Sequence, residues 1–217
     1  RETLTGIGLT NQGTFTSDGF VIKYNSTGTR LWAKAYNSPG DAFPTGMLVD
    51  TNGDVVIVGQ HNNTMDGDPG TANLTINTAG GYDIFYSKLT AGGNLVYTKS
   101  FGSSGGESAR SISTDGSNIF ITGTFANTVD FDAGSGVATQ TAVGPYDAFL
   151  LKLTNSGNYD WAIQSNGSDG EQYLKAAPTS SGDIVLAGAF QNTIDFDPGT
   201  GSDIRTTNGN WDMFAKR

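Results

Sequence analysis

The sequence predicts an all-β protein built from tandem four-stranded antiparallel blades of a β-propeller, each blade corresponding to a repeat of roughly 65 residues. Three observations lead to this fold class: a fixed internal period, short apolar runs bounded by turn residues, and no apolar pattern with a helical period. The composition agrees, since 31 Gly, 36% hydrophobic and only 15% charged residues suit short strands joined by tight turns.

The repeat is defined by four aligned segments. They begin at Asp18, Asp83, Asp147 and Asp212, so that successive copies are 65, 64 and 65 residues apart. Three further sets of landmarks keep the same spacing: the aromatic residues Trp32, Tyr97 and Trp161, the glycines Gly59, Gly123 and Gly188, and the Asn-Thr-apolar-Asp-x-Asp segments at 63–68, 127–132 and 192–197. Chance does not hold this many features in step, so the period sets the architecture.

Each repeat contains four strand signals. In the copy that is easiest to follow, they lie at 148–153, 158–163, 172–177 and 183–188, and Gly, Asn, Asp or Ser bound each run. By analogy with propellers, the run ending near Asp50 or Asp115 is the innermost strand. The next run is the second strand and the Asp-x-Phe run is the third. The strand that carries Trp32, Tyr97 or Trp161 is the outermost.

This order divides the chain into units. The whole chain, 1–217, is one propeller segment, with the end of a preceding blade at 1–38, blades at 41–102 and 107–167, and an incomplete blade at 171–217. Because a closed propeller takes four to eight blades, we expect an incomplete ring within this chain. The ring is then completed by a longer polypeptide or by several copies, or the blades stack.

An insertion separates the second and third strands of each repeat. It holds Asp195-Phe-Asp-Pro-Gly199 and a Thr-rich piece at 204–207, with equivalents at 74–76 and 137–141. We expect a long loop with a short extra strand. Such insertions gather on one face of a repeat array, often the binding face.

Charge and residue content exclude several classes of protein. The net charge is −9 and the isoelectric point is near 4.3, so phosphate backbones and anionic lipid are repelled, and we expect no nucleic acid partner and no membrane insertion. There is no Cys, so no disulfide or thiolate metal site exists. No apolar run has the length of a transmembrane helix, and 1–4 do not read as a signal peptide.

Pairs of aspartates in the insertions are the candidate metal site. Two carboxylates one residue apart in a loop can direct oxygens at one hard cation, so Ca²⁺ is the cofactor they would take. The alternative is turn chemistry without metal, because Asp side chains bond the backbone two residues on. The candidate ligands are Asp66, Asp68, Asp130, Asp132, Asp195 and Asp197.

Other repeated acids have two interpretations. Asp41, Glu107 and Glu171 each follow a Gly, and they either line one end of a central channel or, as we favour, cap backbone amides at a blade junction. The acids that open the third strands, Asp18, Asp83, Asp147 and Asp212, are expected to pair with Lys23, Lys88, Lys152 and Arg217.

Two sets of aromatic residues recur. Trp32, Tyr97 and Trp161 are expected to pack between neighbouring blades, because a ligand site seldom needs every copy of a repeat. Tyr82, Tyr146 and Trp211 are expected to be exposed beside the insertion, where they are the candidate ligand-binding residues.

An enzyme is not expected. His61 is the only His, no Cys exists, and each candidate acid recurs in every copy, as structural residues do. No Gly-rich phosphate loop follows a strand and opens a helix.

The repeat resembles a bacterial β-propeller repeat found in secreted proteins. The residues that carry the resemblance are Asp83-Ile-Phe-Tyr-Ser-Lys-Leu89, Gly106-Glu107 and Asp115-Gly-Ser-Asn-Ile119. The Asp-Phe-Asp-Pro-Gly segment at 195–199 is similar to a version in Bacteroidetes surface and secreted proteins exported by the type IX system. The first copy departs from it at 43–46 and at Asp66-Gly-Asp68.

The resemblance implies an extracellular or bacterial cell-surface location and no definite activity. We therefore expect a non-enzymatic segment for adhesion, surface scaffolding or ligand binding, with a protein or glycan partner at the cell surface. The alternatives are a lectin-like carbohydrate-binding propeller and a structural filament or stalk that associates with itself.

Overall fold

The computed structural model describes residues 3–4, 9–10, 17–197 and 199–216. Every regular element in this part of the chain is a β-strand, which confirms the predicted fold class. A helix that could cross a membrane is accordingly not found among the described residues.

Two complete sheets have four antiparallel strands each. The first has the order β5-β6-β9-β10 and the second β11-β12-β15-β16. Their strands are β5 (Ala42–Val49), β6 (Val55–His61), β9 (Asp83–Leu89), β10 (Leu95–Phe101), β11 (Ser108–Thr114), β12 (Asn118–Phe125), β15 (Asp147–Thr154) and β16 (Tyr159–Gln164). The spatial order follows the order along the chain, as in a propeller blade.

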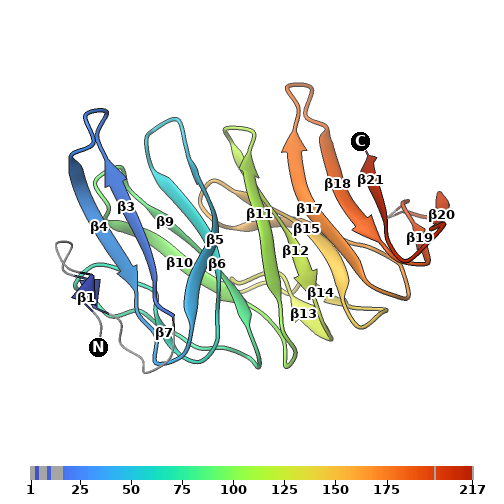
Figure 1. Ribbon diagram of the computed structural model, residues 1–217, viewed down its shortest axis with the longest axis horizontal. Helices are drawn as coiled ribbons and strands as arrows, with labels where there is room; N and C mark the ends of the chain where they lie inside the picture. Colours follow the sequence, from blue (N-terminus) through green and yellow to red (C-terminus); the bar gives the residue numbers. More distant parts are fainter. Residues whose placement is uncertain (1–2, 5–8, 11–16, 198, 217) are drawn as a thin grey trace.

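Two smaller sheets flank them. A pair is formed by β3 (Gly19–Tyr24) and β4 (Arg30–Tyr36), and a three-stranded sheet by β17 (Glu171–Pro178), β18 (Ile184–Phe190) and β21 (Asp212–Lys216). In Figure 1 the four sheets stand side by side in an open row, from β3–β4 at one end to β21 at the other. The described strands close no ring.

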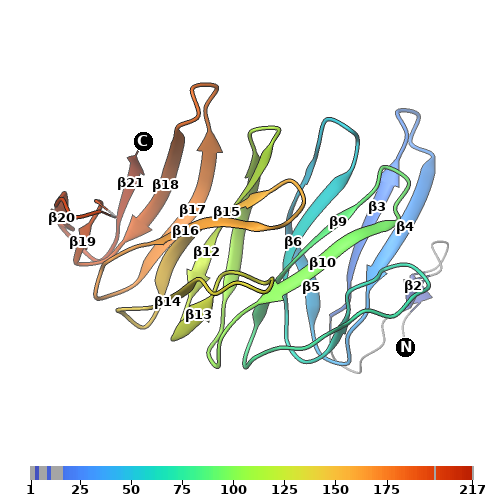
Figure 2. The ribbon, with the colours of Figure 1, turned by 180° about the vertical axis from the view of Figure 1, so that it is seen from behind.

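The insertions form small hairpins, where we expected a loop with one short strand. Each Asp-x-Asp segment pairs with the Thr-rich piece that follows it. These strands are β7 (Met65–Asp66) with β8 (Thr75–Ile76), β13 (Thr128–Asp130) with β14 (Thr139–Thr141), and β19 (Thr193–Asp195) with β20 (Ile204–Thr206); a further pair is β1 (Thr3–Leu4) with β2 (Leu9–Thr10). Seen from behind, β13 and β14 lie below the body of their sheet (Figure 2).

A left-handed asparagine starts each hairpin. Asn63, Asn127 and Asn192 have φ angles of 68°, 56° and 53°. Among residues with a Cβ, Asn adopts this conformation most readily, because its short amide group bonds nearby backbone. The Asn-Thr pair of the repeat is therefore the point at which the chain leaves the second strand and turns into the hairpin.

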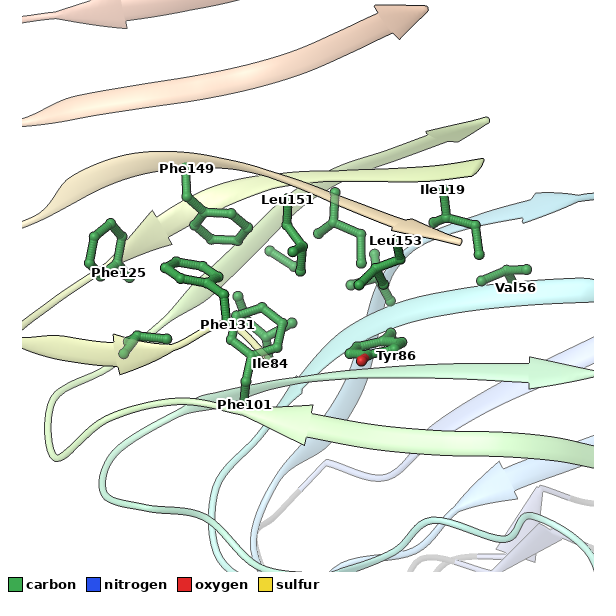
Figure 3. Close-up of a cluster of buried hydrophobic side chains, with 14 residues drawn as sticks. Val56, Ile84, Tyr86, Phe101, Ile119, Phe125, Phe131, Phe149, Leu151 and Leu153 are labelled. Carbon is green, nitrogen blue, oxygen red and sulfur yellow. The ribbon is translucent and has the colours of Figure 1, made fainter. Parts of the chain in front are cut away.

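The core lies between the sheets and uses both faces of the second and third strands. In β6, Val56 and Val58 face the following sheet, whereas Val55 and Ile57 face the preceding one. This explains why the second strand of each repeat is a nearly continuous apolar run. The largest cluster joins the two complete sheets through rings and branched side chains, among them Tyr86, Phe101, Phe131 and Phe149 (Figure 3).

The outermost-strand aromatics pack between neighbouring blades, as predicted. Trp32 Nε1 in β4 donates a hydrogen bond of 3.1 Å to the carbonyl of Ala91, in the turn of the next sheet. Tyr97 in β10 lies against Gly157, which occupies the matching turn one repeat later. Trp161 packs with the cluster between β15 and the last sheet.

The predicted pairing between acids and bases of the third strand is wrong for two copies. Lys88 pairs with Asp50, at 2.8 Å, and Lys152 with Asp160, at 2.9 Å, not with Asp83 and Asp147. The base follows the acid by five positions in each strand, an odd spacing, so the two side chains point to opposite faces and lie far apart. Each third-strand acid instead accepts hydrogen bonds from nearby backbone amides, and Arg217 lies outside the described residues.

Candidate functional site

The Asp-x-Asp residues close the hairpins by binding backbone amides. Asp130 Oδ1 accepts hydrogen bonds from Asp132 N at 3.1 Å and Ala138 N at 2.8 Å. Asp66 and Asp195 do the same with the equivalent amides. The second acid of each pair, at 68, 132 or 197, accepts a bond from the amide of the Gly two residues on.

These contacts are the turn chemistry that we weighed against calcium. One carboxylate oxygen of each Asp is used by the backbone, so a cation would have to be held mainly by the second oxygens. Within the described ranges, no group of three or more His, Cys, Asp or Glu side chains is arranged to hold a metal. The predicted calcium site is therefore a proposal that rests on the donor type alone.

A backbone contact links the residue before each third strand to the start of the next blade. The amide of Glu107 donates to the carbonyl of Tyr82 at 2.7 Å, and Ala42 donates to Ser17 at 2.7 Å. Tyr146 forms a parallel bridge with Gly170 at the same place one repeat later. The acid or alanine that begins each inner strand is thereby fixed against the residue that precedes the third strand.

This spacing corrects the alignment of the repeated acids. Glu107 and Glu171 lie 25 residues after Tyr82 and Tyr146, and the residue 25 after Ser17 is Ala42. Asp41 therefore occupies the position of Gly106 and Gly170, one residue earlier than we predicted. Sequence alone misplaced it because a one-residue shift still puts an acid directly after a Gly.

The two glutamates cap a blade junction from a buried position, which agrees with the interpretation that we favoured. Glu107 accepts hydrogen bonds from the amide and hydroxyl of Ser103, at 2.9 and 2.7 Å. Glu171 accepts a bond of 3.2 Å from the hydroxyl of Ser165. Burial raises the pKa of both carboxyls, and with the nearby Asp147 it raises the pKa of Glu171 to about 7.

The three predicted ligand-binding aromatics line one groove. Its volume is about 530 Å³, and Tyr82, Tyr146 and Trp211 reach it from three successive repeats. The remaining walls come from the starts of β11 and β17 and from the ends of the second strands at Gln60, Thr124 and Gln191. This volume lies within the range of small-ligand sites.

The three rings are not equally available. Tyr146 and Trp211 are 52% and 42% exposed. Tyr82 is only partly exposed, which corrects our expectation. Its hydroxyl donates a hydrogen bond of 2.5 Å to Asp41 Oδ2, and its ring packs against Phe43. The bond to Tyr82 is the main reason why the pKa of Asp41 lies below its usual value.

Arg110 is the groove residue that sequence reasoning missed. Strand β11 has a bulge between Ala109 and Ser111, and β5 and β17 have bulges at the matching places. A bulge leaves one residue unpaired and redirects its side chain. Here it places the exposed Arg110 in the groove wall. The available signal was an unrepeated charge at a repeated position.

The single histidine has a structural role. His61 is buried at the end of β6, where its Nε2 lies 2.8 Å from Ser100 Oγ and its Nδ1 lies 3.1 Å from the carbonyl oxygen of Asn63. Burial lowers its pKa.

Comparison with known proteins bears on the fold. No protein-family model matches the chain. An uncharacterized WD repeat-containing protein of Acanthamoeba polyphaga mimivirus is 26% identical over 208 residues, a match that covers 83% of this chain. The match takes in only 15% of the mimivirus protein. WD repeats are propeller blades of four strands, so this similarity agrees with the observed sheets. The resemblance to the Bacteroidetes repeat stays a prediction.

Proposed function

We propose that this chain is a non-enzymatic ligand-binding segment of a β-propeller that holds a partner protein in the groove across its inner strands. The observation that carries the proposal is the meeting of Tyr146 and Trp211, from two successive repeats, in one open groove of about 530 Å³. Exposed Tyr and Trp side chains supply large contact area with little entropy to lose, and for this reason they dominate protein recognition sites.

The non-enzymatic part of the proposal is supported by the state of the acids. Glu107 and Glu171 are buried and engaged with serine hydroxyls, and they repeat at the same position of successive blades. His61 is held inside the sheet. The groove therefore presents aromatic rings and polar side chains, a combination that is typical of binding sites.

The proposed setting is the outside of a bacterial cell, where the segment serves adhesion or surface scaffolding. Its support is the resemblance of the repeat to secreted propeller repeats. The Thr- and Asn-rich hairpins contact the outermost strands, for example where Gln140 donates to the carbonyl of Ala162, and we propose that the aspartate turns, with calcium as an addition, stiffen them.

A glycan is the second candidate ligand, and it is favoured by the two exposed rings. Carbohydrate recognition in this groove would use Tyr146 and Trp211 as stacking surfaces beside amide side chains such as Gln191. We place it second because the third ring, Tyr82, is already engaged with Asp41 and Phe43.

The test compares binding of the wild-type chain with that of the double variant Tyr146→Ala/Trp211→Ala. The probes are a library of displayed random peptides and a printed glycan array. Tyr24→Ala is the matched control. Tyr24 is an aromatic residue that is 56% exposed at the last position of β3, and it does not line the groove. We expect peptide binding that the double variant loses and the control keeps. Unchanged peptide binding by the double variant, or glycan binding alone, would contradict the proposal.

A further inference from the structure

Arg110 is the one cationic side chain that lines the groove within the described chain. It is exposed, and it makes no hydrogen bond or ion pair with any described residue. This is unusual in a chain of net charge −9 with 21 acidic and only 12 basic residues, because a base on such a surface normally has an acid within reach.

The fold does not require an arginine at this place. The residues at the matching bulges are Thr45 in β5 and Leu174 in β17, and both are exposed. A hydroxyl, a guanidinium and an aliphatic side chain therefore occupy one structural position in three successive blades. Neither bulge geometry nor packing requires a guanidinium at this position. Its role is therefore to be sought in the groove that it lines.

The acids that share the groove are occupied or partly shielded. Glu107 and Glu171 are buried, and their carboxylates accept bonds from Ser103 and Ser165. Asp169 is partly exposed and accepts a bond of 3.1 Å from its neighbour Ser168. Arg110 is consequently the charged group that a ligand entering the groove meets with all of its donors free.

We propose that the groove recognises a polypeptide segment through one acidic side chain, which Arg110 holds by a two-point hydrogen bond beside Tyr146 and Trp211. The proposal rests on the proposed function, since it specifies the partner of the same groove. A guanidinium presents parallel N–H groups that match the two oxygens of a carboxylate. The flanking rings would contact the apolar parts of the same segment.

The surroundings select a single negative charge. A phosphate group with two charges, or a run of acids, would meet Asp169 and the general negative field of the chain, whereas one carboxylate needs only Arg110. We therefore expect selectivity for one Asp or Glu among neutral and apolar residues, and weaker binding of polyglutamate.

The experiment starts from a displayed library of random short peptides, panned separately on the wild-type chain, Arg110→Thr and Trp211→Ala. Thr is chosen because β5 carries it at the same bulge, so the variant should fold. The most enriched peptide and its Glu-to-Gln or Asp-to-Asn form are then titrated against each variant by fluorescence polarisation. Arg110→Lys is added because it keeps the positive charge and loses the two parallel N–H donors of the guanidinium. Leu174→Thr is the control at the equivalent bulge of β17.

We expect one acid to be enriched on the wild-type chain and not on Arg110→Thr. Replacing that acid by its amide should weaken binding to the wild type by about tenfold to a hundredfold and leave binding to Arg110→Thr nearly unchanged. Arg110→Lys should recover only part of the affinity.

Two results would overturn the inference in distinguishable ways. Peptides that bind in a Trp211-dependent manner without any effect of Arg110 would refute the role of Arg110 and leave the proposed function standing. Peptide binding that ignores both residues would refute the proposed function as well. Arg110-dependent binding of an acidic oligosaccharide such as oligogalacturonate, with no enriched peptide, would refute the polypeptide as the ligand.

Discussion

Lys88 Nζ lies 2.8 Å from Asp50 Oδ2, and both side chains are more than nine-tenths buried. Lys88 also donates a hydrogen bond of 3.0 Å to Asn155 Oδ1 in the following blade. The third strand of one sheet is thus tied to the first turn of its own sheet and to the last turn of its neighbour.

Lys88→Met should therefore be strongly destabilising. It leaves the Asp50 carboxylate buried without its partner, for which a loss of about 3–5 kcal/mol in the free energy of unfolding is typical. The equivalent variant Lys152→Met is the control, because Lys152 pairs with a half-exposed Asp160, and such a pair contributes at most about 1 kcal/mol. Urea denaturation followed by tryptophan fluorescence measures both. Equal losses in the free energy of unfolding for the two variants would show that the buried pair stabilises the fold no more than the half-exposed pair does.

Gly157→Ala tests the contact between the two complete blades. Gly157 has φ 72°, and a Cβ there would come within 2.6 Å of the Tyr97 ring. The free energy of unfolding of the variant should fall by about 1–2 kcal/mol because Ala is strained in the left-handed conformation. It should fall by a further ~1–3 kcal/mol because the Cβ overpacks against Tyr97. Gly182→Ala, which has φ 87° and open space around its Cβ, should lose only the first part. Equal changes in Tm for the two variants would mean that the ring does not press on the turn.

Glu171 should make stability fall as pH rises. Burial and Asp147 raise the pKa of Glu171 to about 7, so the folded chain keeps a proton that the unfolded chain releases above its ordinary value of 4.5. The free energy of unfolding therefore decreases between these two pH values, by at most about 3 kcal/mol. Glu171→Gln should match the wild type at about pH 4 and be more stable at about pH 8. A parallel pH dependence of wild type and variant in thermal melts would contradict this assignment.

Asp130 should stabilise its hairpin through hydrogen bonding to two amides. Asp130→Ala removes both bonds and should cost about 1–3 kcal/mol, whereas Asp130→Asn keeps an accepting oxygen and should cost less than half of that. The free energies of unfolding of both variants give the comparison. If Asn is as damaging as Ala, the charge and not the turn is what matters.

The same Asn variant separates calcium from turn chemistry. The calcium proposal predicts that the Tm of the wild type rises in calcium chloride and falls back in EDTA, and that Asp130→Asn responds less. Calcium titrations of both proteins, followed by thermal melts, decide this. A wild-type Tm that is the same in calcium and in EDTA would leave the turn as the only role of these aspartates.

Much of the fold could be predicted because its determinants recur along the chain. The repeated Asp-x-Phe strand, the apolar second strand and the fixed aromatic each report a local environment that reappears every 64 or 65 residues, so comparing the copies predicted strand order and interblade packing. The candidate site was less predictable, because what makes Arg110 distinct is its difference from Thr45 and Leu174. The partners of the lysines could not be predicted either, because Lys88 contacts Asp50 from another strand of its sheet and Asn155 from the next blade.

The contacts between blades join one repeat position to another in the next copy. Trp32 and Lys23 both donate to the carbonyl of Ala91, and Tyr86 and Lys99 both donate to that of Gly157. One contact uses the same positions at two junctions: the third-strand lysine, Lys23 or Lys88, donates to the equivalent turn residue of the next copy, Ala91 or Asn155. Duplication of one whole period would therefore carry this lysine contact into each new junction, because its donor and its acceptor recur with the period.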